Sequence, residues 1–213
     1  MDLLRVSVLL TILSLTLGVV AVSVTGQISP FLQISAGSAI LSIVGLATID
    51  DLFGRQFYGY LASLLAVGIV YRALPLLVLP GLIGMDPHWY AVQTQAVIDT
   101  GSTDPIQNPF YEGAAGYIVY LALIAEILGV QPERAILVLP LILGIVPPLV
   151  GAIITERITR TPIAALTAAA LLVVVPSLVR GAFWPTAQSF ATALFAVFLL
   201  LFLRIYRQQA DPS

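Results

Sequence analysis

The sequence predicts an all-α, polytopic membrane protein with about six transmembrane helices and one external loop that carries an amphipathic, interfacial helix. Two observations of composition support this fold class: 59% of the 213 residues are hydrophobic and only 9% are charged, and the mean hydropathy is +1.03. A soluble core of this length could not bury so much apolar side chain. The third observation is that the charged residues gather between long apolar windows or toward their ends. We therefore expect a multi-pass protein of the cell membrane.

Apolar windows of about 20 residues are each long enough to cross a hydrocarbon core about 30 Å thick. The first window is predicted to be a retained helix, because a second window begins almost at once and no small-residue cleavage site separates them. These two windows form a predicted N-terminal transmembrane hairpin over residues 1–56, and residues 57–213 form a second transmembrane region. The windows are 4–24, 28–48, 57–79, 135–154, 162–179 and 187–203.

A further apolar window, 113–129, is shorter and carries Glu126, which would be costly in the middle of a bilayer. The positive-inside rule decides its status, because arginine-bearing connections face the cytoplasm. If this window lies on the outer interface without crossing, most arginines fall on one side of the membrane. If it crosses, two arginine pairs move to the other side. We therefore expect an interfacial helix, with Arg5, Arg55, Arg157, Arg160, Arg204 and Arg207 on the cytoplasmic side and Arg72, Arg134 and Arg180 outside.

This topology makes residues 81–134 a single external loop that holds more than half of the acidic residues. Near its start, Asp86 stands where an N-cap carboxylate accepts backbone N–H groups, and Pro87 where a first-turn proline is tolerated. A helix is predicted to run from there to about Thr100 and to stop at Gly101. The acidic residues of the loop are Asp86, Asp99, Asp104, Glu112, Glu126 and Glu133.

The helical repeat divides the side chains of this predicted helix into two faces. A helix with one polar and one apolar face is expected to lie on the membrane surface. The polar face contains His88, Gln95 and Asp99, and the apolar face contains Trp89, Val92 and Ala96.

Three short runs stand in the order found in a known family. They are Arg72-Ala73-Leu74-Pro75, Gly84-Met85-Asp86-Pro87-His88-Trp89-Tyr90 and Asn108-Pro109-Phe110-Tyr111-Glu112-Gly113. Together they resemble the first external loop of the GT-C superfamily of membrane glycosyltransferases, and most closely the N-terminal transmembrane region of archaeal oligosaccharyltransferase catalytic subunits. The downstream order of an interfacial helix, a span, a short basic turn and two further spans is also similar. The resemblance covers about residues 72–207.

The resemblance implies transfer of a sugar or glycan from a lipid phosphate or pyrophosphate donor at the outer membrane face. Asp86 would act there as a ligand of Mg²⁺ or Mn²⁺, or as a general base in relatives that need no metal. A hard divalent cation prefers oxygen ligands and offsets the charge that develops on the leaving phosphate. The alternative is that Asp86 only caps its helix. The implied partners are a lipid-linked sugar donor, membrane lipids and further membrane subunits.

Three other residues are weighed as parts of this site. His88 is a candidate metal ligand or proton shuttle beside Asp86, against the alternative of an ordinary surface histidine. Arg72, near the outer end of its span, and Arg180, in the next external turn, are candidates for holding the donor phosphate. Their alternative role is that of interfacial anchors whose charged heads reach toward water.

Two departures from the family keep a non-catalytic function open. The second acidic motif of the family has no counterpart, because residues 181–188 contain no carboxylate. The family's chains also continue through more spans, so a fragment, a split subunit or a degenerate copy is an alternative. A transporter fragment ranks lower, because the charges gather in loops and at the ends of spans.

Composition excludes some chemistry directly. The chain has no cysteine, which removes disulfides, thiol catalysis and thiolate metal sites. All nine basic residues are arginine, and they do not cluster into a basic stripe. Nucleic acid is therefore not an expected partner.

Overall fold

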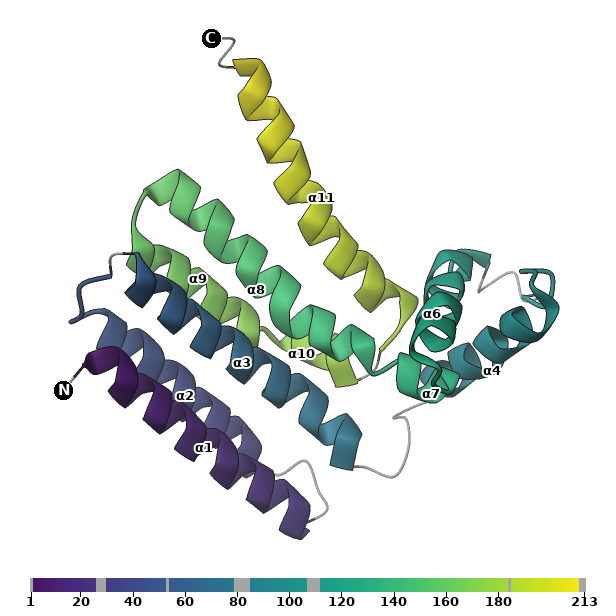
Figure 1. Cartoon of the computed structure of the whole chain (residues 1–213), viewed down its shortest axis with the longest axis horizontal. Coiled ribbons are helices and arrows are strands. Elements are labelled where there is room, and N and C mark those ends of the chain that lie inside the picture. The colour runs from purple at the N-terminus through teal and green to yellow at the C-terminus, as the bar shows by residue number, and fades with distance from the viewer. Residues whose placement is uncertain are drawn as a thin grey trace.

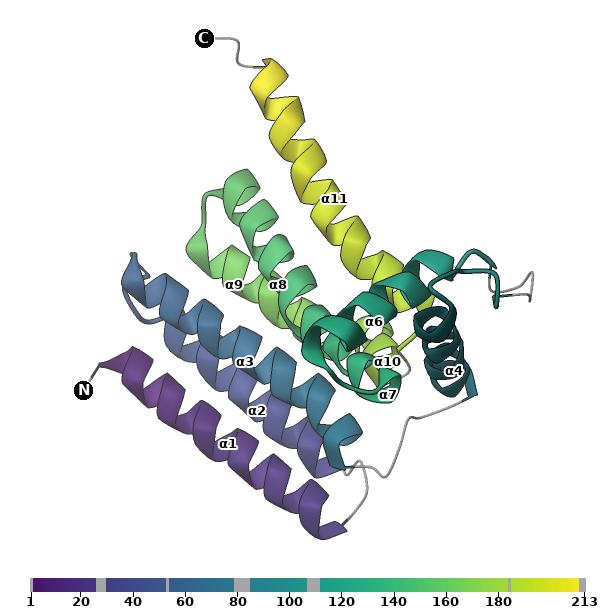
Figure 2. The ribbon, with the colours of Figure 1, turned by 45° about the vertical axis from the view of Figure 1, so that its right-hand side comes forward.

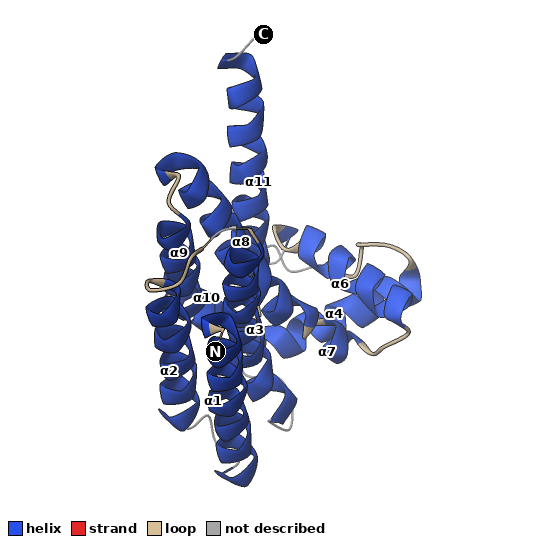
Figure 3. Cartoon of the chain, turned by 60° about the vertical axis from the view of Figure 1, so that its left-hand side comes forward, coloured by secondary structure: helices blue, strands red, loops and turns tan. Residues whose placement is uncertain are grey.

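The computed structural model describes residues 2–25, 30–52, 54–78, 85–106, 112–183 and 185–210, and every regular element in these ranges is a helix (Figure 3). The all-α prediction is therefore confirmed for this part of the chain. The helices are α1 (Leu3–Thr25), α2 (Pro30–Ala47), α3 (Arg55–Val78), α4 (Met85–Thr100), α6 (Ala115–Leu128), α7 (Pro132–Ala135), α8 (Val138–Thr159), α9 (Pro162–Val174), α10 (Pro176–Phe183) and α11 (Ala187–Ala210).

Helices α1, α2, α3, α8 and α9 pack side by side as an antiparallel bundle (Figure 1). Its core contains buried side chains from all five helices, among them Val22 of α1, Ile43 of α2, Tyr60 of α3, Ala152 of α8 and Leu166 of α9. The hairpin of α1 and α2 packs against α3, and α2 and α3 also contact α9. The N-terminal hairpin and the α8–α9 hairpin therefore belong to one bundle.

Helices α3 and α8 approach each other closely at two facing glycines. A Cβ atom built on Gly68 would lie 2.6 Å from the carbonyl oxygen of Gly144, and one built on Gly144 would lie 2.9 Å from the Gly68 backbone. Small residues allow such contacts between the backbones of membrane helices. The two glycines therefore set the distance between α3 and α8.

Among the described residues, four helical segments are long and apolar enough, by length and composition, to cross a membrane: Leu3–Thr25, Arg55–Leu74, Pro132–Thr159 and Ala187–Tyr206. This supports a membrane protein, but the predicted count of about six spans is not confirmed. The predicted spans 28–48 and 162–179 correspond to α2 and α9, whose described apolar stretches are shorter.

Helix α9 ends at Val174, within the predicted span 162–179. Val175 has an extended ψ of 125°, as the residue before a proline favours, and α10 begins at Pro176. Proline has no backbone N–H and cannot continue the helical hydrogen bonds. The 13 residues of α9 cover about 20 Å, less than a hydrocarbon core of about 30 Å. Helix α9 alone is therefore shorter than a membrane span, and the predicted span 162–179 is not confirmed.

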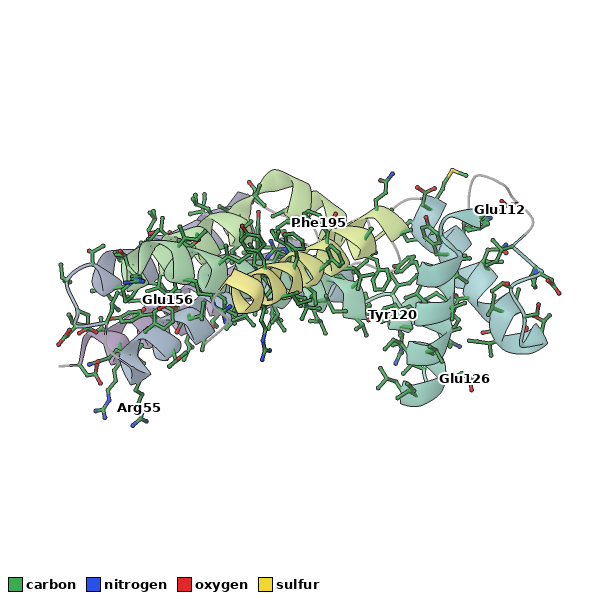
Figure 4. The ribbon with its side chains drawn as sticks, turned by 90° about the horizontal axis from the view of Figure 1, so that it is seen from above. Arg55, Glu112, Tyr120, Glu126, Glu156 and Phe195 are labelled. Carbon is green, nitrogen blue, oxygen red and sulfur yellow. The ribbon has the colours of Figure 1, made fainter. Side chains whose placement is uncertain are left out.

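Several arginines gather at one end of the bundle. The start of α1, the start of α3 and the α8–α9 connection lie together at one end, where Figure 4 shows Arg55 and Glu156. We call this the arginine-rich end, because Arg5, Arg157 and Arg160 belong to the same helix termini. Glu112 and Glu126 lie toward the opposite end (Figure 4). The structure thus groups these arginines as expected, and which end faces the cytoplasm stays a prediction.

Candidate functional site

Helices α4, α6 and α7 form a lobe beside the end of the bundle opposite the arginine-rich end (Figure 2). Helix α4 ends at Thr100, and Gly101 has a φ of 65°. The N–H of Gly101 donates to the carbonyl oxygen of Val97, with an N···O distance of 2.8 Å. A positive φ favours glycine, so the predicted stop at Gly101 is confirmed with its physical reason.

The buried face of α4, which packs on α6 and α7, is not the predicted apolar face. Val92, expected on the apolar face, is 63% exposed, while Trp89 and Ala96 are only half-buried. The polar Thr94 is fully buried. A further, buried face of α4 packs on α6 and α7, and the predicted position of this helix on the membrane surface stays a prediction. The buried residues of α4 are Pro87, Tyr90, Ala91, Thr94 and Val97.

Aromatic rings connect α4, α6 and α11. The ring of Tyr90 lies edge-on to Tyr117 with centroids 5.1 Å apart, and Phe190 of α11 lies 5.4 Å from Tyr117 and 4.6 Å from Tyr120. Burial raises the pKa of the Tyr117 hydroxyl, and the neighbouring tyrosines act in the same direction. The hydroxyl therefore stays protonated at neutral pH. These contacts hold the lobe against the start of α11.

Asp86 lies half-buried in the first turn of α4. Helix α4 is described from Met85, and the residues just before it lie outside the described part of the chain. Asp86 lies in the first turn rather than at the predicted capping position, and the helix macrodipole stabilises a carboxylate there.

His88 is exposed and follows Asp86 by two residues. Side chains two residues apart on a helix point to different sides and do not face each other. His88 instead shares its exposed face with Gln95 and Asp99, where Gln95 Nε2 donates to Asp99 Oδ1 at 2.8 Å. The helix therefore does not present Asp86 and His88 as a convergent pair, and a separate role for His88 stays a prediction.

Arg72 is completely buried between α3 and α9. Its Nη2 donates to the carbonyl oxygen of Leu172 at 2.8 Å, and Nη1 makes a longer contact of 3.4 Å to the carbonyl oxygen of Gly68. An interfacial anchor would extend its charged head toward the surface, which this side chain does not do. A donor phosphate could reach Arg72 only after a rearrangement of these helices, so the predicted phosphate contact stays a prediction.

Sequence reasoning missed the hydrogen bond between Arg72 and Leu172, although one signal for it was present. Pro176 stands four residues after Leu172 and cannot donate the helical hydrogen bond to its carbonyl. A buried carbonyl left in this way needs another donor. The sequence does not show which side chain supplies it, because Arg72 lies a hundred residues earlier.

Arg180 belongs to α10, but its side chain lies outside the described part of the structure. Residues 107–111, which include most of the third run of the family resemblance, also lie outside the described part of the chain. So does Gly84, in the second run. The predicted contacts of Arg180 with a phosphate therefore stay a prediction.

A cavity of about 380 Å³ opens between α4, α6 and the turn after α4. Glu126, from the last part of α6, lies on its rim and is exposed. Most of the remaining lining is apolar or hydroxyl-bearing, including Val97, Ser102 and Leu123. The cavity lies within the lobe, between helices that the sequence assigned to the external loop.

The described residues do not bring together three His, Asp or Glu side chains that could hold a metal ion. Asp86 is the one carboxylate at the start of α4, and His88 points to another side of the helix. Magnesium in proteins often binds one or two carboxylates together with substrate phosphates. The donor set described here does not by itself fit a metal centre, so we derive no step through Mg²⁺ or Mn²⁺.

Comparison with protein-family models, curated proteins and solved structures gives no match to this chain. The resemblance to the GT-C superfamily therefore rests on the motifs and the order of the spans.

Proposed function

We propose that this chain is the membrane region of a GT-C-like glycosyltransferase, which transfers a sugar or glycan from a lipid-phosphate-linked donor at the external membrane face. The observation that carries the proposal is the position of Asp86. It lies half-buried but accessible in the first turn of α4, on a lobe beside the arginine-poor end of the bundle. By the positive-inside rule this end faces outward, where the headgroup of a lipid-linked donor would meet the lobe.

In this proposal Asp86 acts as the general base. Its carboxylate accepts the proton of the acceptor hydroxyl or amide as that group attacks the anomeric carbon of the donor sugar. The bond between the anomeric carbon and the phosphate oxygen breaks, and the lipid phosphate or pyrophosphate leaves with the bonding electrons. Arg72 does not hold the donor phosphate in this arrangement, because its guanidinium donates to the backbone of α9. Its contribution is indirect, through the contact between α3 and α9.

A transfer assay with an acidic control on the same helix tests the proposal. The chain is expressed in membranes depleted of other glycosyltransferases and supplied with a labelled lipid-linked sugar, with Mg²⁺, with Mn²⁺ and with a chelator. Removing a general base typically lowers the rate by 10²–10⁴-fold, so Asp86→Asn should lose transfer on that scale. Asp99→Asn should retain it, because Asp99 is exposed and bonds only to Gln95 among the described partners.

The assay has clear contrary outcomes. Equal transfer by wild type and Asp86→Asn would remove Asp86 from the chemistry. Absence of transfer by inserted wild-type protein, with donor present, would favour the second candidate function, a non-catalytic membrane subunit.

One observation supports that candidate: α11 is exposed over most of its length, with Phe195 and Phe198 each 65% exposed. Such a surface can pack against a further membrane helix as well as lipid.

A further inference from the structure

The C-terminal halves of α8 and α11 enclose a cavity at the arginine-rich end of the molecule. Its volume is about 430 Å³, within the usual range of ligand sites. Figure 1 shows α11 diverging from α8 toward the C-terminus, and the cavity, which we call the α8–α11 groove, is lined by residues of both helices. The lining includes Ile154, Arg157, Arg160, Leu200, Leu203 and Tyr206.

The polar part of the groove is positively charged. Arg157 and Arg160 are both exposed, and neither makes a salt bridge within the described ranges of the chain, where Arg5 and Asp2 form the ion pair. Glu156 precedes Arg157 in the sequence but does not line the groove. Two arginines without a carboxylate partner form a site for an anion, and guanidinium groups match phosphate oxygens well.

The turn after α8 holds these arginines in place. Arg160 ends the helix in a left-handed conformation with a φ of 54°, and its N–H donates to the carbonyl oxygen of Glu156 at 2.8 Å. Thr159 and Thr161 bond to each other across the turn, with the N–H of Thr161 donating to Thr159 Oγ1 at 3.2 Å. The local backbone therefore fixes where the two arginine side chains leave the main chain.

The deeper part of the groove is apolar. Ile154 contributes from α8, and Leu200 and Leu203 contribute from α11, with Tyr206 nearer the end of that helix. Tyrosine favours the boundary between hydrocarbon and headgroups, because its ring is apolar and its hydroxyl polar. A ligand that fits must combine an anionic head with a hydrocarbon tail.

From this geometry we infer that the α8–α11 groove binds an anionic phospholipid of the leaflet at the arginine-rich end. Its phosphate lies against Arg157 and Arg160, and an acyl chain follows Ile154, Leu200 and Leu203. The positive-inside rule assigns this end to the cytoplasm, the leaflet where basic pockets between helices meet anionic headgroups. The inference rests on the charge and shape of the groove and is independent of the proposed glycosyltransferase function.

Native mass spectrometry of the purified, detergent-solubilised chain tests the site. Wild type is titrated with phosphatidylglycerol and, separately, with phosphatidylcholine of the same chains. Arg157→Gln/Arg160→Gln should weaken phosphatidylglycerol binding roughly 30-fold, since each arginine near a membrane surface contributes about 1 kcal/mol. The control pair Arg5→Gln/Arg55→Gln removes the same charge from the same end but outside the groove, and should change binding by less than about threefold.

A second variant keeps the charges and fills the apolar part. Leu200→Trp should weaken phosphatidylglycerol binding while both arginines remain, and excess inorganic phosphate should not displace the lipid from wild type. Circular dichroism confirms that each variant is folded. Three results would overturn the inference: equal weakening by the control pair, full displacement by inorganic phosphate, or a dimer in the same spectra that forms only without lipid, which would assign the groove to a second copy.

Discussion

Arg72 donates a hydrogen bond from Nη2 to the carbonyl oxygen of Leu172, 2.8 Å away on another helix. In a continuous helix this carbonyl would accept the N–H of residue 176, but Pro176 has none. Arg72 thus supplies the missing donor and joins α3 to the break between α9 and α10. Its Nε has no hydrogen-bond partner within the described part of the chain. A charged group is therefore held in the bundle by backbone carbonyls.

Replacing Arg72 with methionine should lower the free energy of unfolding by about 1–3 kcal/mol, the cost of leaving a buried polar group unsatisfied. Methionine fills much of the volume of the arginine stem, so the loss reports mainly on the hydrogen bond. Unfolding in mixed detergent, followed by circular dichroism, measures it. Arg55→Met is the control, because Arg55 is exposed. Unchanged or higher stability would mean that burying the guanidinium costs more than its hydrogen bonds contribute.

Replacing Pro176 with alanine should reduce the effect of losing Arg72. Alanine restores an N–H at residue 176 that can bond to Leu172, so the carbonyl no longer depends on the guanidinium. In a double-mutant cycle, Arg72→Met should cost about 1 kcal/mol less in the Pro176→Ala background. The same unfolding measurement on the four proteins gives the coupling. Strict additivity would show that the proline and the arginine act independently.

Replacing Gly144 with alanine should destabilise the bundle by about 1–3 kcal/mol, the usual cost of overpacking. The new Cβ would lie 2.9 Å from the backbone of Gly68, which cannot move like the end of a side chain. Thermal unfolding in detergent measures the change. Gly45→Ala is the matched control in α2, because no atom lies within 4 Å of its added Cβ. Equal behaviour of the two variants would contradict the close contact of α3 and α8.

Single cysteines should report the orientation of the chain in a membrane. The sequence has no cysteine, so each variant carries a single thiol. Gln131→Cys should react with an impermeant reagent from outside, and Thr159→Cys at the arginine-rich end should be protected until the membrane is opened. Both positions are exposed in the structure. Protection at residue 131 with reaction at residue 159 would reverse the predicted topology.

Local signals in the sequence were sufficient for several features. Composition and apolar windows predict an all-helical membrane protein, because apolar side chain in this amount requires lipid. The end of α4 follows from Gly101, whose positive φ belongs to glycine. The grouping of arginines at one end follows from the number of predicted spans between them, because two consecutive spans return the chain to the same end. These features depend on residues close together in the chain or on totals over the whole chain.

Other features needed the tertiary structure. Helices that are apolar on nearly every side carry no periodic signal of which face is buried, so the burial of Arg72 could not be predicted. The partner of the Leu172 carbonyl lies a hundred residues away, and the groove is lined by side chains from both α8 and α11. The sequence determined the class of protein and the extent of many helices. Packing between distant segments decided which polar groups are buried together and where a ligand could bind, because such contacts depend on relative helix positions that no local pattern encodes.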